Sequence, residues 1–218
     1  MSAIIFPVVF FIFVAAVLNG KLFLQRKYSY SEKAHIFIPL LLGSSVLLLT
    51  LYNVELAVPS AFVLLLLVTV IGVYVGFSYL WSRTLDTEYI YGLHTVPTEY
   101  RSIVTVNPVA DTTKLCEILF QDVVVLVLVL SLNSLFENTF IALAIFTCIV
   151  FAVHVPAVKF FGKIFGTYWL LLSTLLAPLA FYLSGFQYGL YYLFMLHASI
   201  NLLLYIVIYI LSKSKHKT

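Results

Sequence analysis

The sequence predicts an all-α, polytopic membrane protein, a bundle of transmembrane helices. Of its 218 residues, 63% are apolar and only 10% are charged, and the mean hydropathy of +1.09 lies far above that of a water-soluble domain. The apolar residues also gather into long runs, and a helix that crosses the hydrocarbon core needs roughly 20 of them. Seven such runs take up most of the chain, so we expect a single membrane-embedded unit with no second, water-soluble domain.

The apolar runs define seven predicted helices. In chain order they are residues 3–20, 36–52, 59–81, 113–133, 139–156, 164–184 and 187–211. The first run is short, but it has no positively charged start and no small-residue cleavage site before Lys21, so we expect a retained helix and not a signal peptide. The fourth helix is expected to begin at an N-cap formed by Asp111 or Thr112. The long loop before it, residues 82–112, is expected to lie along the membrane interface, as a gate or as a passive connector.

The positive charges test this helix count, because Lys and Arg collect in cytoplasmic loops. All twelve lie in the first, third and fifth loops and the C-terminal tail: Lys21, Arg26, Lys27, Lys33, Arg83, Arg101, Lys114, Lys159, Lys163, Lys213, Lys215 and Lys217. The other loops carry only Glu55 and Glu137 as charged residues. We therefore predict seven transmembrane helices with the N-terminus outside and the C-terminus in the cytoplasm, in the cell membrane or the endoplasmic reticulum membrane.

Charge and cysteine content argue against a nucleic-acid partner and against a site built from cysteines. The sequence pI of about 8.8 is basic, but the cations are spread over four segments and form no dense stripe, so we expect no nucleic-acid partner. The two cysteines, Cys116 and Cys148, lie in or against apolar runs and form no CxxC pair. Nothing therefore indicates a disulfide framework or a cysteine metal site.

The informative residues are the polar ones inside the predicted helices, because each costs several kcal/mol unless it has a partner or faces water. They are Glu117, Gln121 and Asp122 in the fourth helix, His154 in the fifth, and His197 and Asn201 in the seventh. This gathering on three helices is typical of a buried polar site.

Spacing groups these residues further. Glu117 and Gln121 are four apart and share a helical face, as do His197 and Asn201. Asp122 lies about 140° further round the helix from Glu117 at 3.6 residues per turn, and it either joins the site or pairs with another helix or loop. The structural alternatives are a helix-end role for His154 and an interhelical hydrogen bond for His197.

Three segments resemble the motifs of the CPBP (CAAX protease and bacteriocin-processing) intramembrane endopeptidase family. Residues 116–122, Cys-Glu-Ile-Leu-Phe-Gln-Asp, look like the EExxxR motif. Residues 149–154, Ile-Val-Phe-Ala-Val-His, resemble FxxxH with the Phe one position closer to the His, and residues 197–201, His-Ala-Ser-Ile-Asn, match HxxxN. The order of the motifs and their helices also agree with the family.

The resemblance implies a domain organisation. Residues 1–112 would form three scaffold helices with a cytoplasmic loop, residues 113–211 the four-helix CPBP-like core, and residues 212–218 a basic cytoplasmic tail.

The first motif can be aligned in two registers. If Glu117 takes the second Glu position, Cys116 replaces the family's water-activating Glu and Gln121 replaces the Arg. If Glu117 takes the first position, Asp122 replaces the Arg. We prefer the former register, because Phe120-Gln121 then falls where Phe-Arg usually stands.

The resemblance implies that Glu117, His154, His197 and Asn201 carry catalysis, with Cys116, Gln121 and Asp122 as supporting residues. Glu117 is the candidate general base towards water, and Asn201 the candidate donor to the oxyanion of a peptide carbonyl. His154 would orient the water or, together with His197, hold a divalent metal such as zinc. The sequence indicates no organic cofactor.

Two functional classes follow. The first is an intramembrane endopeptidase that cleaves a membrane-anchored or lipidated peptide near the cytoplasmic face of the bilayer. The second is a non-catalytic relative that acts as a scaffold, an immunity protein or a subunit of a membrane complex. Retention of both histidines and Asn201 favours the first class, and the changes at Cys116 and Gln121 favour the second.

The predicted topology can be tested by cysteine labelling in intact cells. Cysteines introduced beside Glu55 and Glu137 should react with an impermeant maleimide added outside, because these loops carry no cation. Cysteines introduced beside Arg101 and Lys215 should stay unlabelled until the membrane is permeabilised. Labelling beside Arg101 from outside would reverse the orientation.

Overall fold

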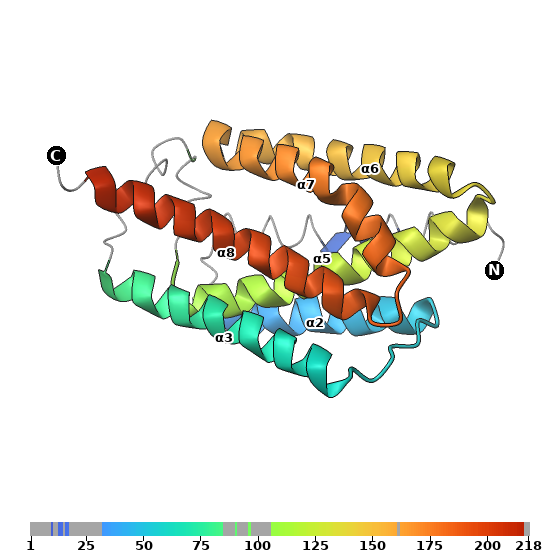
Figure 1. Ribbon diagram of the computed structural model, residues 1–218, viewed down its shortest axis with the longest axis horizontal. Helices are drawn as coiled ribbons and strands as arrows, with labels where there is room; N and C mark the ends of the chain where they lie inside the picture. Colours follow the sequence, from blue (N-terminus) through green and yellow to red (C-terminus); the bar gives the residue numbers. More distant parts are fainter. Residues whose placement is uncertain are drawn as a thin grey trace.

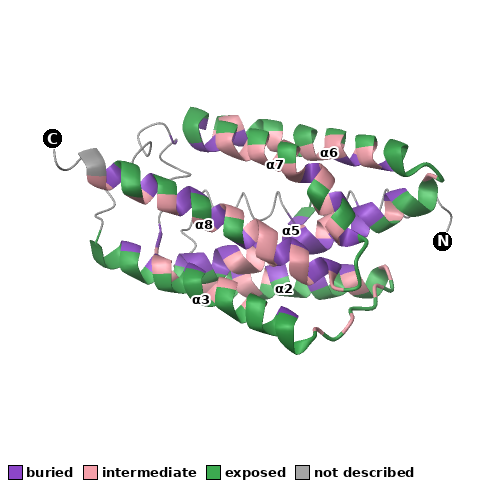
Figure 2. Cartoon of the chain, in the orientation of Figure 1, coloured by how far each residue is buried: buried purple, intermediate pink, exposed green. Residues whose placement is uncertain are grey.

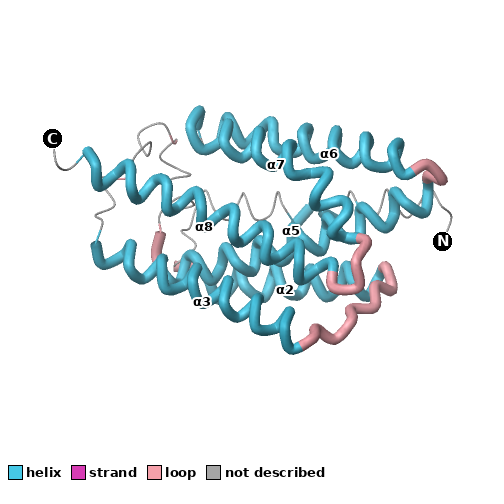
Figure 3. The backbone as a smooth tube through the Cα atoms, in the orientation of Figure 1, coloured by secondary structure: helices cyan, strands magenta, loops and turns pink. Residues whose placement is uncertain are grey.

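The computed structural model describes residues 32–84, 106–160 and 162–215, together with the single positions 10, 13, 14, 16, 17, 90 and 96. Its six long helices are α2 (Ala34–Leu51), α3 (Ala61–Thr84), α5 (Pro108–Leu135), α6 (Thr139–Phe160), α7 (Gly162–Ser184) and α8 (Gly189–Lys215) (Figure 1). The described residues contain no strand (Figure 3). All six helices are long and apolar enough to cross a membrane. The predicted all-α, multi-pass membrane architecture is confirmed.

These helices correspond to the second to seventh predicted spans. The first predicted span, residues 3–20, lies mainly outside the described residues, although Phe10, Phe13, Val14, Ala16 and Val17 are helical. The interfacial loop, residues 82–112, also lies largely outside them, as does the end of the basic tail. The transmembrane helix at residues 3–20, the total of seven such helices and the orientation of the termini therefore stay predictions.

Helix α5 lies at the centre of the bundle. It packs against α2, α8, α7, α6 and α3, while α6 pairs with α7 and α3 pairs with α8. Half of its most apolar stretch is buried, compared with 17% for α3 and for α6. Figure 2 shows the contrast between the purple faces of α5 and the green outer surface of α3. The apolar outer faces of α3 and α6 suit contact with lipid tails.

Local sequence signals account for the helix starts. The Asn107 side chain accepts a hydrogen bond from the Ala110 amide at 2.9 Å, and Pro108 fills the first helical position of α5. The prediction of an N-cap at Asp111 or Thr112 is therefore wrong. The apolar run begins only after these residues, but the helix begins one turn earlier, so the Asp111 side chain lies inside the bundle.

A close approach between two helices holds α6 and α7 together as a hairpin. At Gly166, an added Cβ would lie 2.3 Å from the Val158 Cα and 2.4 Å from the Ala157 carbonyl oxygen. Gly162, one turn earlier, has a positive φ of 75° and lies where the chain turns from α6 into α7. Small residues that let two backbones approach closely are the usual basis of helix packing in membranes.

The ends of the bundle differ in charge. Arg83 lies in the last turn of α3, and Lys159 and Lys163 flank the turn between α6 and α7. Lys213, near the end of α8, donates to the Thr84 carbonyl of α3. We call this the basic end; Figure 1 shows it on the left. The loops at the opposite end carry Glu55 and Glu137. Among the described residues, charge is separated as the sequence predicts.

The hairpin contact gives a stability test. Gly166→Ala should destabilise the protein by about 1–3 kcal/mol, because the new methyl group overlaps the α6 backbone. Thermal unfolding in detergent would measure this loss. Gly72→Ala is the matched control, since no described atom lies within 4 Å of its Cβ position, and it should be neutral or slightly stabilising. Equal effects at both sites would contradict the close approach.

Candidate functional site

The clearest polar contact between helices joins Asp122 of α5 to His197 of α8. The His197 Nδ1 lies 3.2 Å from the Asp122 Oδ1, and the two residues are 75 apart in sequence. The Asp122 side chain is 4% exposed and the His197 side chain 27%. If the carboxylate accepts the Nδ1 hydrogen, the imidazole orientation is fixed and Nε2 is left as an acceptor. Asp122 thus pairs with another helix, and because its partner is His197, it also joins the predicted polar group.

The second oxygen of Asp122 is unsatisfied. Oδ2 is buried and has no hydrogen-bond partner among the described residues. Buried polar atoms of this kind are normally satisfied by water or by a proton. The Asp122–His197 pair is therefore a place where a proton can be held within the bundle.

Glu117 and Gln121 share one face of α5, as their spacing predicts. The Gln121 Nε2 donates to the Glu117 Oε1 at 3.0 Å, and both side chains are half-buried. Glu117 also interacts electrostatically with His197. Glu117 therefore faces the same region of the bundle as the Asp122–His197 pair.

His154 brings α6 to this group. It is half-buried and interacts electrostatically with His197. Its Nδ1 lies 2.7 Å from the Val150 carbonyl of its own helix, which orients the ring and leaves Nε2 for other partners. Glu117 of α5 and His154 of α6 thus both act on the His197 imidazole of α8.

Asn201 is turned towards its own helix. Its Nδ2 donates to the His197 carbonyl oxygen at 3.0 Å, and the residue is buried. One amide hydrogen is used by this bond, so a role as oxyanion donor requires the second hydrogen or a rotation of the side chain. His197 and Asn201 occupy successive turns of one face, as predicted.

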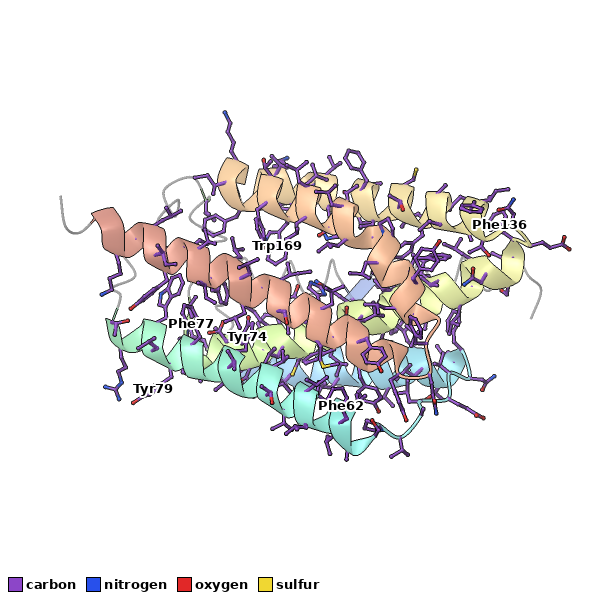
Figure 4. The ribbon with its side chains drawn as sticks, viewed as in Figure 1. Phe62, Tyr74, Phe77, Tyr79, Phe136 and Trp169 are labelled. Carbon is purple, nitrogen blue, oxygen red and sulfur yellow. The ribbon has the colours of Figure 1, made fainter. Side chains whose placement is uncertain are left out.

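Helix α7 contributes aromatic side chains that the sequence prediction did not include. The Trp169 ring lies 6.5 Å from the His197 ring, edge-on, and the Tyr168 hydroxyl donates to the Ile200 carbonyl of α8 at 3.1 Å. Figure 4 shows Trp169 on the side of α7 that faces α8. All four core helices therefore reach the site.

The ionisable residues of the site do not form a recognisable set of metal ligands in the part of the chain that the structure describes. Among the residues that the structure describes, no three His, Cys, Asp or Glu side chains are grouped so that they could hold a metal ion. The metal role expected for His154 and His197 stays a prediction. Cys116 is half-buried at the edge of the apolar core, and it is not part of a disulfide.

A second polar cluster, which the sequence prediction missed, lies towards the basic end. Ser78 of α3 donates to the Asp111 Oδ2, Lys114 donates to the Tyr205 hydroxyl of α8, and the Lys114 Nζ lies 3.8 Å from the Asp111 Oδ1. All four residues are buried. Lys114 was counted with the loop cations, but it lies inside α5. The i, i+3 spacing of Asp111 and Lys114 and the position of Tyr205 four residues after Asn201 were the available signals.

Comparison of the chain with protein-family models, with curated proteins and with solved structures found no match. The resemblance to the CPBP family therefore stays a prediction that rests on its three motifs.

The Asp122–His197 contact predicts a measurable coupling energy. In a double-mutant cycle with Asp122→Ala and His197→Ala, the two changes should couple by about 1–2 kcal/mol, because either one alone leaves a polar partner in the bundle. Chemical unfolding in mixed micelles would measure the four stabilities. Asp122→Ala with Ser134→Ala is the control, since these positions lie about 18 Å apart along α5. Coupling below about 0.5 kcal/mol in both cycles would contradict the pair.

Proposed function

We propose that this protein is an intramembrane endopeptidase in which Glu117 activates a water molecule for attack on a peptide bond. The observation that carries the proposal is the contact between Asp122 of α5 and His197 of α8 at 3.2 Å. Glu117 and His154 are linked to His197 by charge interactions. A bundle without chemistry has little reason to gather ionisable groups from three helices inside a membrane.

The chemistry follows from the positions of these groups. Glu117 would take a proton from water while the oxygen attacks the carbonyl carbon of the peptide, and the carbonyl oxygen becomes an oxyanion. The Asn201 amide, after release from the His197 carbonyl, would donate to that oxyanion. Protonated Glu117 then gives its proton to the leaving amine. His154 would orient the water, and Asp122 would keep the His197 ring in place.

The substrate proposed for this site is a membrane-anchored or lipidated peptide. Glu117 lies nearer the basic end of α5 than the apolar residues Val123, Val127 and Leu132. A peptide held in the bilayer beside this end would present a peptide bond at that depth. If the positive charges mark the cytoplasm, cleavage takes place near the cytoplasmic face.

The second candidate is a non-catalytic scaffold, immunity protein or membrane-complex subunit. Two hydrogen bonds within single helices favour this candidate. Gln121 donates to the Glu117 carboxylate, and Asn201 donates to the His197 carbonyl, so both proposed catalytic groups already have partners. In such a protein the same polar groups would serve helix packing alone.

A cleavage assay separates these candidates. Purified protein would be incubated with a library of membrane-tethered peptides, and released fragments would be detected by mass spectrometry. Glu117→Gln should lower the rate at least about 100-fold, because the amide keeps the shape and the contact with Gln121 but accepts no proton. His154→Ala should also be impaired. Cys116→Ala is the matched control and should be nearly silent.

The outcomes are distinct. Full activity in Glu117→Gln would eliminate the proposed mechanism. No cleavage by the wild type, with activity created by Cys116→Glu together with Gln121→Arg, would favour the non-catalytic candidate.

A further inference from the structure

Two cations from different helices meet where α3 and α8 end at the basic end of the bundle. Arg83 lies in the last turn of α3, and Lys213 of α8 donates to the carbonyl of Thr84, the residue after Arg83, although Thr84 and Lys213 are 129 residues apart in sequence. The Tyr209 hydroxyl of α8 lies 2.9 Å from the Thr84 hydroxyl and joins the same two helix ends. We call Arg83, Thr84, Tyr209 and Lys213 the α3–α8 corner.

The positive charges of this corner keep most of their hydrogen-bond donors. Arg83 is exposed, and its Cζ lies 5.3 Å from the centre of the Tyr79 ring, a contact that uses the face of the guanidinium and not its N–H groups. Lys213 gives one of its three ammonium hydrogens to the Thr84 carbonyl. Among the residues that the structure describes, neither cation forms an ion pair with a carboxylate. The corner can therefore bind an anion.

An open strip of helix surface leads away from the corner. Gly72, Gly76, Tyr79 and Arg83 follow one another at intervals of four, three and four residues and so share one face of α3. Tyr79 is 55% exposed, and a Cβ added at Gly72 or Gly76 would meet no described atom within 4 Å. Figure 4 shows Tyr79 on the side of α3 that points away from α8, opposite to Tyr74. We call this face the outer strip of α3.

The length of the outer strip matches one leaflet of a bilayer. At 1.5 Å per residue, Gly72 lies about 16 Å from Arg83 along the helix axis. The hydrocarbon core of a membrane is roughly 30 Å thick, so one leaflet takes up about half of that distance. A lipid whose headgroup lies at Arg83 would therefore have its acyl chain beside Gly76 and Gly72, where no side chain stands on the helix surface.

We propose that the α3–α8 corner and the outer strip of α3 bind one anionic phospholipid. Its phosphate would lie between Arg83, which can donate two parallel hydrogen bonds to it, and Lys213, which acts as a point charge. Its acyl chain would lie along the outer strip. Basic side chains at the ends of transmembrane helices are typical partners of anionic headgroups. This lipid site is separate from the polar site of the proposed function and does not depend on peptide hydrolysis.

The same strip could in principle pack against a second copy of the chain, because Gly72 and Gly76 have the spacing of helix dimers in membranes. Two copies inserted with the same orientation would be related by a two-fold axis along the membrane normal. Each Arg83 would then lie against the Arg83 of the second copy, and like charges repel. The charge of the strip therefore favours a lipid over a dimer.

Native mass spectrometry of the full chain in detergent would test the site. The protein would be titrated with phosphatidylglycerol and, separately, with phosphatidylcholine of the same acyl chains. The wild type should bind one phosphatidylglycerol in preference to phosphatidylcholine. Arg83→Gln should weaken the binding of phosphatidylglycerol about fivefold, and Arg83→Gln together with Lys213→Gln about 30-fold, as expected for one and two cations at a membrane surface. The binding of phosphatidylcholine should not change.

Lys159→Gln together with Lys163→Gln is the matched control. This variant removes the same charge from exposed side chains at the same end of the bundle, and it should keep the affinity for phosphatidylglycerol within about twofold, because separated surface charges are screened. An equal loss in both double variants would overturn the site, since it would reflect the general charge of the basic end. Arg83→Gln alone carries the test if loss of the Lys213–Thr84 contact unfolds the protein.

Three further results would overturn the lipid site. Competition by glycerophosphoglycerol, the headgroup without acyl chains, at the concentration of the lipid would indicate a site for free phosphate. A dimer in the absence of lipid that Gly76→Leu abolishes would indicate a second copy on the outer strip. Asp86 and Glu88 follow Arg83 in the sequence, outside the described residues, and an unchanged affinity in Arg83→Gln would indicate that Arg83 pairs with a carboxylate instead of a lipid.

Discussion

Hydrocarbon cannot solvate a polar side chain, so each ionisable group in this bundle depends on a partner from a neighbouring helix. The contact between α5 and α8 supplies such partners at two positions along the helices. Asp122 pairs with His197, and nearer the basic end Asp111 and Lys114 both contact the Tyr205 hydroxyl. These contacts fix the rotation of α8 against α5. The positions of Glu117 and Asn201 follow from that rotation, since each lies on the same helix as one of the paired residues.

The remaining helices complete the site from two sides. Helix α3 contributes Ser78 to the cluster at the basic end, and the ring of its Tyr74 lies 5.9 Å from the Tyr205 ring. It also packs on α8 through Trp81 and Phe77, whose rings lie 5.8 and 5.6 Å from the Tyr209 ring. The hairpin of α6 and α7 supplies His154 and Trp169. Because Gly166 holds the two hairpin helices backbone to backbone, these two side chains belong to one packed unit.

Much of the fold could be predicted from the sequence, because length and apolar content identify membrane helices almost without regard to tertiary structure. The shared faces of Glu117 with Gln121 and of His197 with Asn201 also followed from helical spacing alone. For Asp122, the spacing left open whether it joins the site or pairs with another helix or loop, and it did not identify His197 as the partner. The helices are apolar on nearly every side, so their hydrophobic pattern does not show which face points inward. Lys114 was missed for a related reason, since a cation near a helix end looks like a topology signal until its partners are known.

The sequence separation within the Asp122–His197 pair has a consequence for biosynthesis. The ribosome releases α5 well before α8, and His197 is made 75 residues after Asp122. During that interval, the Asp122 carboxylate lacks the imidazole that donates a hydrogen bond to it in the finished bundle. Helix α5 must therefore remain beside the insertion machinery, or carry Asp122 in its neutral form, until the last helix arrives. The order in which this chain enters the membrane is thus tied to the position of a single histidine near its end.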